Sequence, residues 1–182
     1  MDKVGTVARR RFAVGTVMAM MAWALETRST AQPRMRNAEA EKDPGGDAVT
    51  NVTPFLLFAG NCNQAMEFYQ SCLGGELTQL KVGDSPAKEL LPSNQHHKIL
   101  NARLKCRSID ISACDWLRPD RERVPGNTVC LYLNAGSPAE LRVLFERLSE
   151  GAEVTDPIKE MFFGTYGALN DKFGVRWMFH YN

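Results

Sequence analysis

The stretch "DKFGVRWMFHY", from Asp171 to Tyr181, decides how this chain folds. Its glycine indicates a turn, and the residues after it alternate as in a strand. One side of that strand is purely apolar and is predicted to be buried: Val175, Trp177 and Phe179. The other side carries Arg176, Met178 and His180. A methionine here is unexpected, because small metal-dependent enzymes often place a ligand carboxylate in such a strand.

Two helices are predicted upstream, in the stretches "NQAMEFYQSCLGG" and "SPAELRVLFERLSEG". The first carries one apolar stripe at helical spacing, made by Ala65, Phe68, Tyr69, Cys72 and Leu73. The second repeats it with Leu141, Leu144, Phe145 and Leu148. Ser137 is the predicted N-cap of the second helix, Pro138 its first residue, and Glu140 the residue that closes a capping box.

One strand is expected before each helix and three after it. The expected strands cover residues 54–59, 75–82, 98–106 and 108–115 in the first half, and 128–133, 152–162, 164–171 and 174–181 in the second. The sequence therefore predicts an α+β fold of two βαβββ modules, about 52–116 and 126–182. Their curled mixed sheets would surround a cup, with one helix packed behind each module.

The alternation along the strands assigns their faces. The apolar sets expected beneath the helices are Phe55, Leu57 and Ala59, then Val129, Leu131 and Leu133, then Val175, Trp177 and Phe179. Pro54, Leu56 and Phe58 are expected on the opposite face, with Asp110 and His180. The residues predicted to bind a ligand on this cup face are Asn101, Arg103, Ser112, Cys114, Thr128, Cys130, Tyr132, Arg176 and Met178. Either arginine could hold a carboxylate or phosphate, or could instead pair with Asp110.

The N-terminal residues have the layout of an export signal. Residues 1–31 combine the basic cluster Arg9–Arg11 with an apolar run and a small-residue end, and they resemble a twin-arginine signal. A mitochondrial transit peptide and an uncleaved anchor remain alternatives. Residues 32–51 are polar and predict a flexible tether. The single domain is then 52–182, expected in the periplasm or cell envelope and membrane-bound only through an uncleaved signal.

Charge and cysteine content limit the function. The formal net charge is +1 and the pI about 7.6, so no basic field indicates nucleic acid, and a small-molecule ligand is expected. The five cysteines are an odd number without CxxC spacing, which favours free thiols over a disulfide framework or a zinc site.

These residues resemble the vicinal oxygen chelate superfamily, which includes glyoxalase I, bleomycin-resistance proteins and extradiol dioxygenases. The stretches "LLFAGNCNQAMEFYQSCLGGELTQL" and "LSEGAEVTDPIKEMFFGTYGALNDKFGVRWM", with the "NARL" strand, are similar to its PhnB-like branch. The resemblance implies a cup, often in a homodimer, that holds a divalent metal chelated by vicinal oxygens of the substrate.

The metal-ligand positions that the resemblance implies fall on Pro54, Thr128, Met178 and residues 112–114. None is a strong oxygen or nitrogen ligand, so no metal and no other cofactor is predicted. The branch often has a histidine where this chain has Asn101. Other donors are weaker candidates: His96 and His97 in a loop, His180 on a frayed strand, and Cys114 with Cys130 as a soft-metal pair or a nucleophile.

Three functions stay open. The first is an exported binding module that takes up a small molecule without the usual metal site. The second is a metal-dependent glyoxalase-type or dioxygenase-type lyase or isomerase with atypical ligands, so whether the protein is an enzyme is left undecided. The third is an interaction partner in the cell envelope. Methyl transfer, a label associated with the branch, finds no support, because no glycine-rich nucleotide loop follows an expected strand.

Overall fold

A computed structural model describes residues 52–107, 109–118 and 120–182. The predicted export signal and tether lie outside these residues. Within the described part, no helix is long and apolar enough to cross a membrane.

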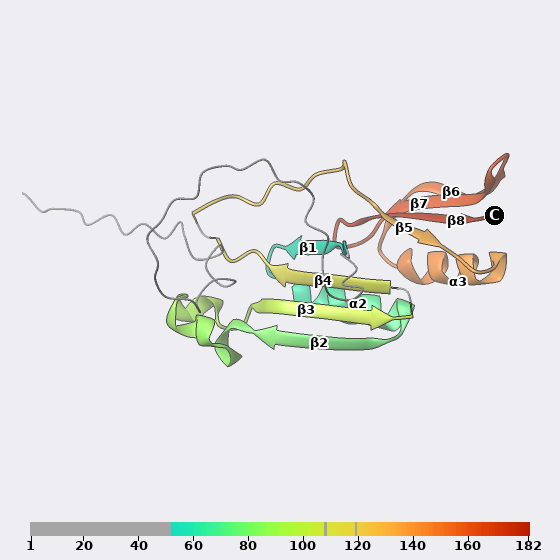
Figure 1. The fold of residues 1–182 in the computed structure, drawn as a ribbon. Helices are drawn as coiled ribbons and strands as arrows, with labels where there is room; N and C mark the ends of the chain where they lie inside the picture. Colours follow the sequence, from blue (N-terminus) through green and yellow to red (C-terminus); the bar gives the residue numbers. More distant parts are fainter. Residues whose placement is uncertain (1–51, 108, 119) are drawn as a thin grey trace, which may run out of the picture. The chain divides into compact units, whose positions relative to one another are not determined.

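The first module is a four-stranded sheet with one helix (Figure 1). It consists of β1 (Phe55–Phe58), α2 (Cys62–Leu73), β2 (Glu76–Lys81), β3 (Ile99–Cys106) and β4 (Ile109–Asp115). The strand order is β1-β4-β3-β2; β1 is parallel to β4, and the other pairs are antiparallel. Three short 3₁₀ turns, Val82–Asp84, Pro86–Glu89 and Ser93–Gln95, fill the predicted loop between β2 and β3.

The second module repeats this topology. It consists of β5 (Leu131–Asn134), α3 (Pro138–Leu148), β6 (Glu153–Met161), β7 (Gly164–Asn170) and β8 (Arg176–Tyr181), with the order β5-β8-β7-β6. The predicted α+β class and both βαβββ modules are therefore confirmed. The two sheets are separate, however, and do not close around a cup within one chain.

The start of α3 follows its sequence signals closely. The Ser137 hydroxyl accepts a hydrogen bond from the Glu140 backbone N–H at 3.1 Å, as an N-cap does. Glu140 Oε2 accepts from the backbone N–H of Gly136 at 2.8 Å, one residue before the position that a capping box would use.

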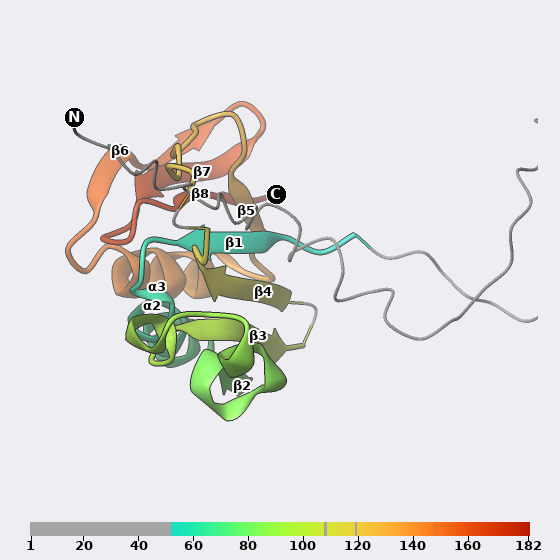
Figure 2. The same cartoon turned by 90° about the vertical axis from the view of Figure 1, so that its left-hand side faces the viewer.

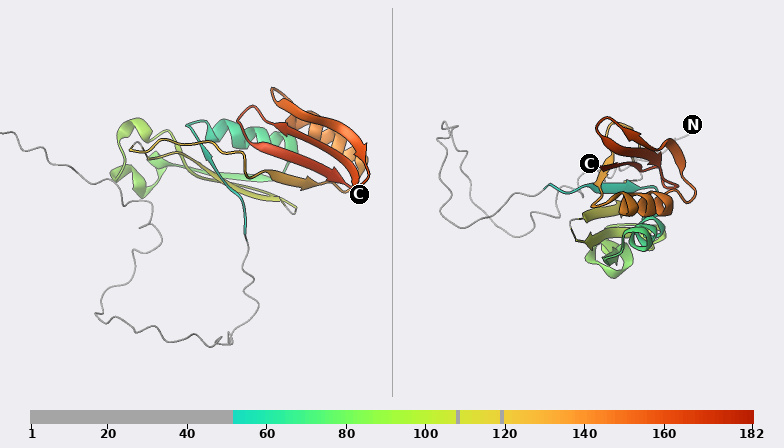
Figure 3. Two further views of the ribbon diagram at one scale, coloured as in Figure 1. Left: turned by 90° about the horizontal axis from the view of Figure 1, so that it is seen from above. Right: turned by 90° about the vertical axis from the view of Figure 1, so that its right-hand side faces the viewer.

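One hydrophobic core joins the two modules. Helices α2 and α3 contact each other and lie next to one another beside the sheets (Figure 2). Their buried side chains share a cluster with residues of both sheets, including Tyr69, Leu104, Leu141 and Phe179. Figure 3 shows the strands of the second sheet curving over α3. Each sheet thus has one face against the helices and one face without a helix, which we call its open face.

The structure reverses the predicted faces of β1. Leu56 and Phe58 pack into the core, whereas Phe55 is 52% exposed and Leu57 is 38% exposed. All four residues of β1 are apolar, so alternation could not distinguish its sides, and Ala59 is exposed beyond the strand. Val129 was also predicted beneath a helix but is exposed, because β5 begins two residues later. The predictions for β8 are confirmed: Trp177 and Phe179 are buried, and Val175 packs against the core.

Candidate binding site on the open sheet faces

The first open face is set by the register of β1, β4, β3 and β2. Ser112 stands between Phe55 of β1 and Arg103 of β3, and Cys114 is paired with Leu57. Asn101 and Leu80 continue the same side toward the far edge. The predicted residues Asn101, Arg103, Ser112 and Cys114 therefore share one face, together with two apolar side chains that the sequence reasoning had placed beneath α2.

Arg103 on this face is already paired. Its Nε donates to Asp110 Oδ1 at 2.8 Å and its Nη2 to Oδ2 at 2.6 Å, a bidentate ion pair. The hydrogen bonds to Arg103 lower the pKa of the Asp110 carboxyl, and the same contacts raise the pKa of Arg103. A ligand would have to compete with Asp110 for this guanidinium.

Cys114 is poorly placed to react. Only 1% of its surface is exposed, and burial, followed by the neighbouring Asp115 charge, raises the pKa of its thiol to about 11. The nucleophilic form of cysteine is the thiolate, so Cys114 is a protonated core side chain at neutral pH.

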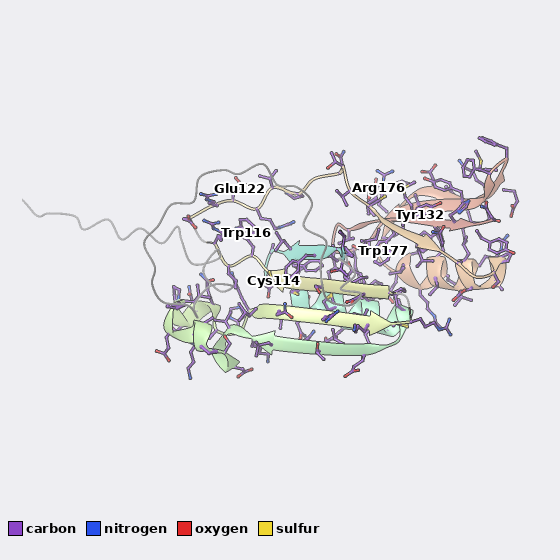
Figure 4. The ribbon with its side chains drawn as sticks, in the orientation of Figure 1. Cys114, Trp116, Glu122, Tyr132, Arg176 and Trp177 are labelled. Atoms are coloured by element: carbon purple, nitrogen blue, oxygen red, sulfur yellow. The ribbon has the colours of Figure 1, made fainter. Side chains whose placement is uncertain are left out.

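The second open face combines β5, β8 and β7. Tyr132 is paired with Met178, and Met178 with Ala168; one row further on, Asn134, His180 and Tyr166 lie side by side. Cys130, before β5, places its Sγ 3.1 Å from Met178 Sδ. Thr128 is exposed in the segment that precedes the strand. Figure 4 labels Tyr132 and Arg176 on this sheet and Cys114 on the other.

Aromatic rings form a stack across the second open face. Tyr132 stacks on His180 with centroids 5.8 Å apart and planes 23° apart, and Phe163 lies 6.1 Å from His180 on a tilted plane. His180 Nε2 is 2.9 Å from the Phe163 carbonyl oxygen, so this nitrogen carries the proton and donates it. Tyr132 nevertheless remains 52% exposed, which leaves much of its ring available for contact.

Arg176 extends the second open face on the other side of Met178. Among the described residues, no carboxylate oxygen lies within 4.0 Å of its guanidinium and no side-chain hydrogen bond satisfies it. The positive charge of Arg176 acts on Tyr166 and by itself lowers the pKa of the Tyr166 phenol. Burial and the Asp156 charge outweigh that effect and raise the pKa overall, so Tyr166 keeps its proton.

The "DKFG" residues, Asp171 to Gly174, have a structural role, because the Asp171 carboxylate is used in hydrogen bonds within the protein. Asp171 is buried and accepts hydrogen bonds from Tyr69 Oη at 2.7 Å and Trp177 Nε1 at 2.9 Å. It also accepts from the backbone N–H groups of Phe173 and Val175, both at 2.9 Å. This carboxylate ties α2 of the first module to the β7–β8 turn of the second.

The residues at the metal positions implied by the resemblance do not fit a hard divalent cation. Pro54 has no side-chain donor, Thr128 is exposed outside the strand, and Met178 contacts Cys130 through sulfur. Such ions require several converging oxygen or imidazole donors. Across residues 52–107, 109–118 and 120–182, no three His, Cys, Asp or Glu side chains gather as a metal site.

A groove that the sequence reasoning missed lies between the two modules. Its volume is about 1210 Å³, and its walls include the start of β4, the unpaired side of β5 and the outer face of α3. Cys130 and Tyr132 are the predicted site residues that line it. Its charged lining residues are Arg107, Arg147, Asp110 and Glu140. The groove joins segments far apart in the sequence, and an exposed Val143 on α3 was its one local signal.

Known proteins share this fold. The chain is 30% identical to protein YjdN of Escherichia coli (strain K12) over 137 residues, which cover 70% of this chain and 92% of that protein. A crystal structure of protein PA1353 from Pseudomonas aeruginosa is 34% identical with a TM-score of 0.67, covering 74% of this chain and 98% of that one.

A third similarity bears on the fold alone. A putative 3-demethylubiquinone-9 3-methyltransferase, PhnB protein, from Bacillus cereus is 20% identical with a TM-score of 0.59, covering 73% of this chain and 100% of that one. This similarity confirms the predicted fold of two βαβββ modules. Because the family model described as 3-demethylubiquinone-9 3-methyltransferase matches residues 50–179, most of the chain, this protein belongs to that family.

Proposed function

We propose that this chain is an exported protein that binds a small molecule on its open sheet faces, without the metal site usual in the superfamily. The observation that carries the proposal is the second open face. There the half-exposed Tyr132 ring stacks on the His180 ring, next to the Arg176 guanidinium, which has no ion pair or side-chain hydrogen bond within the described part of the chain. Polar groups that are partly removed from water are stabilised by hydrogen-bond partners, and a bound ligand can supply such partners.

Binding is favoured over catalysis by the state of the candidate reactive groups. The Cys114 thiol is buried and protonated, and Arg103 is held by Asp110. Both ring nitrogens of His180 lie within 3.3 Å of protein oxygens, Asn134 Oδ1 and the Phe163 carbonyl. An acid–base reaction needs a group free to exchange a proton with the substrate.

The proposal includes a homodimer. Among the described strands, β1 and β5 each pair with one neighbour and form an edge of their sheet, and the apolar residues Phe55, Leu57 and Val129 in or next to them are exposed. Unpaired strand edges with apolar neighbours favour association. Sedimentation equilibrium should give twice the chain mass, and Leu57→Lys should weaken the dimer; a monomer at micromolar concentration would contradict the proposal.

Export is the second part of the proposal and rests on residues 1–31. A fusion of these residues to a reporter that is active only after twin-arginine export should be active. Replacement of Arg9 and Arg10 by lysine should abolish that activity, whereas Lys3→Ala should not. If the fusion with lysine at positions 9 and 10 were as active as the unchanged fusion, the twin-arginine route would be contradicted.

The binding function is tested on protein purified from its native route without chelator. We expect no stoichiometric transition metal by elemental mass spectrometry. Thermal unfolding against a library of small anions and aromatic compounds should reveal ligands that raise Tm, because a ligand that binds only the folded chain stabilises it. One equivalent of a transition metal would overturn the metal-free proposal, and a library without any stabilising compound would overturn the binding proposal.

A further inference from the structure

We propose that the second open face recognises a planar aromatic ring that carries a short anionic group, a carboxylate or a phosphate. This inference rests on the proposed binding function and adds the class of ligand and the residues that select it. Tyr132 would stack on the ring, and Arg176 would hold the anion.

The ring would bind on Tyr132. One side of the Tyr132 ring is stacked on His180, which is in turn fixed by its hydrogen bond to the Phe163 carbonyl oxygen. The ring is therefore held in place yet 52% exposed. A rigid aromatic surface gives contact area at little entropic cost, and stacked rings attract each other beyond simple area burial.

The anion would bind to Arg176. The register places Arg176 two residues before Met178 in β8, and Met178 is the partner of Tyr132 in β5. Two residues along a strand are roughly 7 Å apart. Among the described residues, Arg176 forms no ion pair and no side-chain hydrogen bond. A guanidinium binds carboxylate or phosphate through two parallel hydrogen bonds.

The sulfur atoms of Cys130 and Met178 form the floor between these two groups. They lie 3.1 Å apart and are half-buried, so they offer a polarisable surface rather than competing charges. Tyr166 lies in the next row, beside His180, and interacts electrostatically with Asp156, Arg176, Cys130 and Tyr132. A ring with a linker of one or two atoms to the anion spans this separation.

The first open face lacks this combination. Its arginine, Arg103, donates two hydrogen bonds to Asp110. Its exposed apolar residues are Phe55, Leu57 and Leu80, and none of them belongs to a stack of rings among the described residues. The difference between the two sheets locates the selective part of the site on the second module.

The test uses the full chain and four probes of similar size: phenylacetate, phenyl phosphate, cyclohexylacetate and phenylacetamide. Cyclohexylacetate keeps the charge without an aromatic face, and phenylacetamide keeps the ring without the charge. Isothermal titration calorimetry should show binding of phenylacetate or phenyl phosphate, and the tighter of the two identifies the preferred anion. Cyclohexylacetate and phenylacetamide should each bind at least about tenfold more weakly than the preferred anionic aromatic probe.

Two variants locate the site. Arg176→Gln should weaken the preferred anionic probe by about tenfold, and Tyr132→Leu by roughly fivefold. Arg142→Gln, on the exposed side of α3, is the matched control and should leave the Kd unchanged. Circular dichroism and the thermal midpoint should be measured for each variant to check that it is folded. Substitutions outside the core usually change the free energy of unfolding little.

The outcomes separate this inference from the function on which it rests. If cyclohexylacetate or phenylacetamide bound as tightly as the anionic aromatic probes, the ligand class would be wrong. The assignment would also be wrong if folded Arg176→Gln and Tyr132→Leu bound with the Kd of the unchanged chain. In both cases the binding function would survive. A chain that bound none of the four probes but other library compounds would likewise refute only the ligand class.

Discussion

At the scale of single residues, Asp171 is a buried side chain that links the two modules by hydrogen bonds. A buried carboxylate is costly unless hydrogen bonds satisfy it, and Asp171 accepts four. Two of its donors, Tyr69 and Trp177, come from different modules and also contact each other edge to face at 5.5 Å. The residue therefore links the core to the turn before β8.

Replacing Asp171 by asparagine should destabilise the fold strongly. The amide group would present a donor to groups that already donate, so we expect a loss of about 3 kcal/mol in the free energy of unfolding. Tyr69→Phe removes one donor and should cost about 1 kcal/mol. Urea unfolding measures both, and an Asp171→Asn variant as stable as the natural chain would refute this role.

Stability should fall in the alkaline range. The pKa of the Cys114 thiol rises from 9.0 to about 11 on folding, and burial beside Asp171 raises the pKa of Tyr69 above its usual 10.0. The folded chain thus holds protons that the unfolded chain releases, so their contribution is complete below pH 9 and is lost as the pH rises from 9.0 toward about 11. Urea midpoints across this range should decline, and less steeply in Cys114→Ala; flat midpoints would contradict the assignment.

Residue types predicted part of the candidate site. The alternation correctly placed Arg176, Met178 and His180 opposite the buried Trp177 and Phe179, because only one side of β8 is apolar. The sequence left two roles open for Arg103, and the structure shows the pairing with Asp110. That Arg176 has no such partner in residues 52–107, 109–118 and 120–182 could not be read from the sequence, since it depends on which carboxylates the fold brings near.

At the scale of elements, the turn between α2 and β2 depends on Gly75. Its φ is +92°, a conformation that other residues rarely adopt, and an added Cβ would lie 2.6 Å from Cys106 Cβ and against the backbone of Lys105. The first sheet thus packs against the end of α2 at a point with no room for a side chain.

Gly75→Ala should therefore lower the free energy of unfolding by about 2 kcal/mol or more. Gly126→Ala is the matched control, because an added Cβ there meets no atom within 4 Å and its φ is not positive. Thermal and urea unfolding of the two variants should differ clearly. Equal stability would mean that the turn accommodates a side chain by shifting.

The sequence predicted the helices and strands, but it did not predict which side of β1 faces the core. The helices and strands appear where periodicity and caps place them, with boundaries shifted by a few residues. In β1 the sequence "FLLF" is apolar on both sides, so only its parallel register with β4, which aligns Phe55 with Ser112, decides that Leu56 and Phe58 face α2.

At the scale of the whole molecule, the two modules should unfold together. Leu104 in β3 and Leu141 in α3 are fully buried in one cluster that contains residues of both modules. Leu104→Ala and Leu141→Ala should each cost about 2–5 kcal/mol and shift a single transition seen by both far-ultraviolet circular dichroism and tryptophan fluorescence. Two transitions, each sensitive to one substitution, would show that the modules fold independently.

The sequence by itself determined the fold class and the repeated module, because apolar periodicity, helix caps and glycine turns are local signals that occur twice in one chain. The family followed from the resemblance of whole stretches of the sequence, which the family model then matched. It also determined that the implied metal positions lack suitable donors, which is a matter of residue identity. Tertiary structure alone decided which side of β1 faces the core, the separation of the two sheets and the groove between the modules. It also decided that Arg103 is paired with Asp110 while Arg176 has no carboxylate partner among the residues that the structure describes. Each of these depends on which distant segments meet, and packing across the whole core selects that.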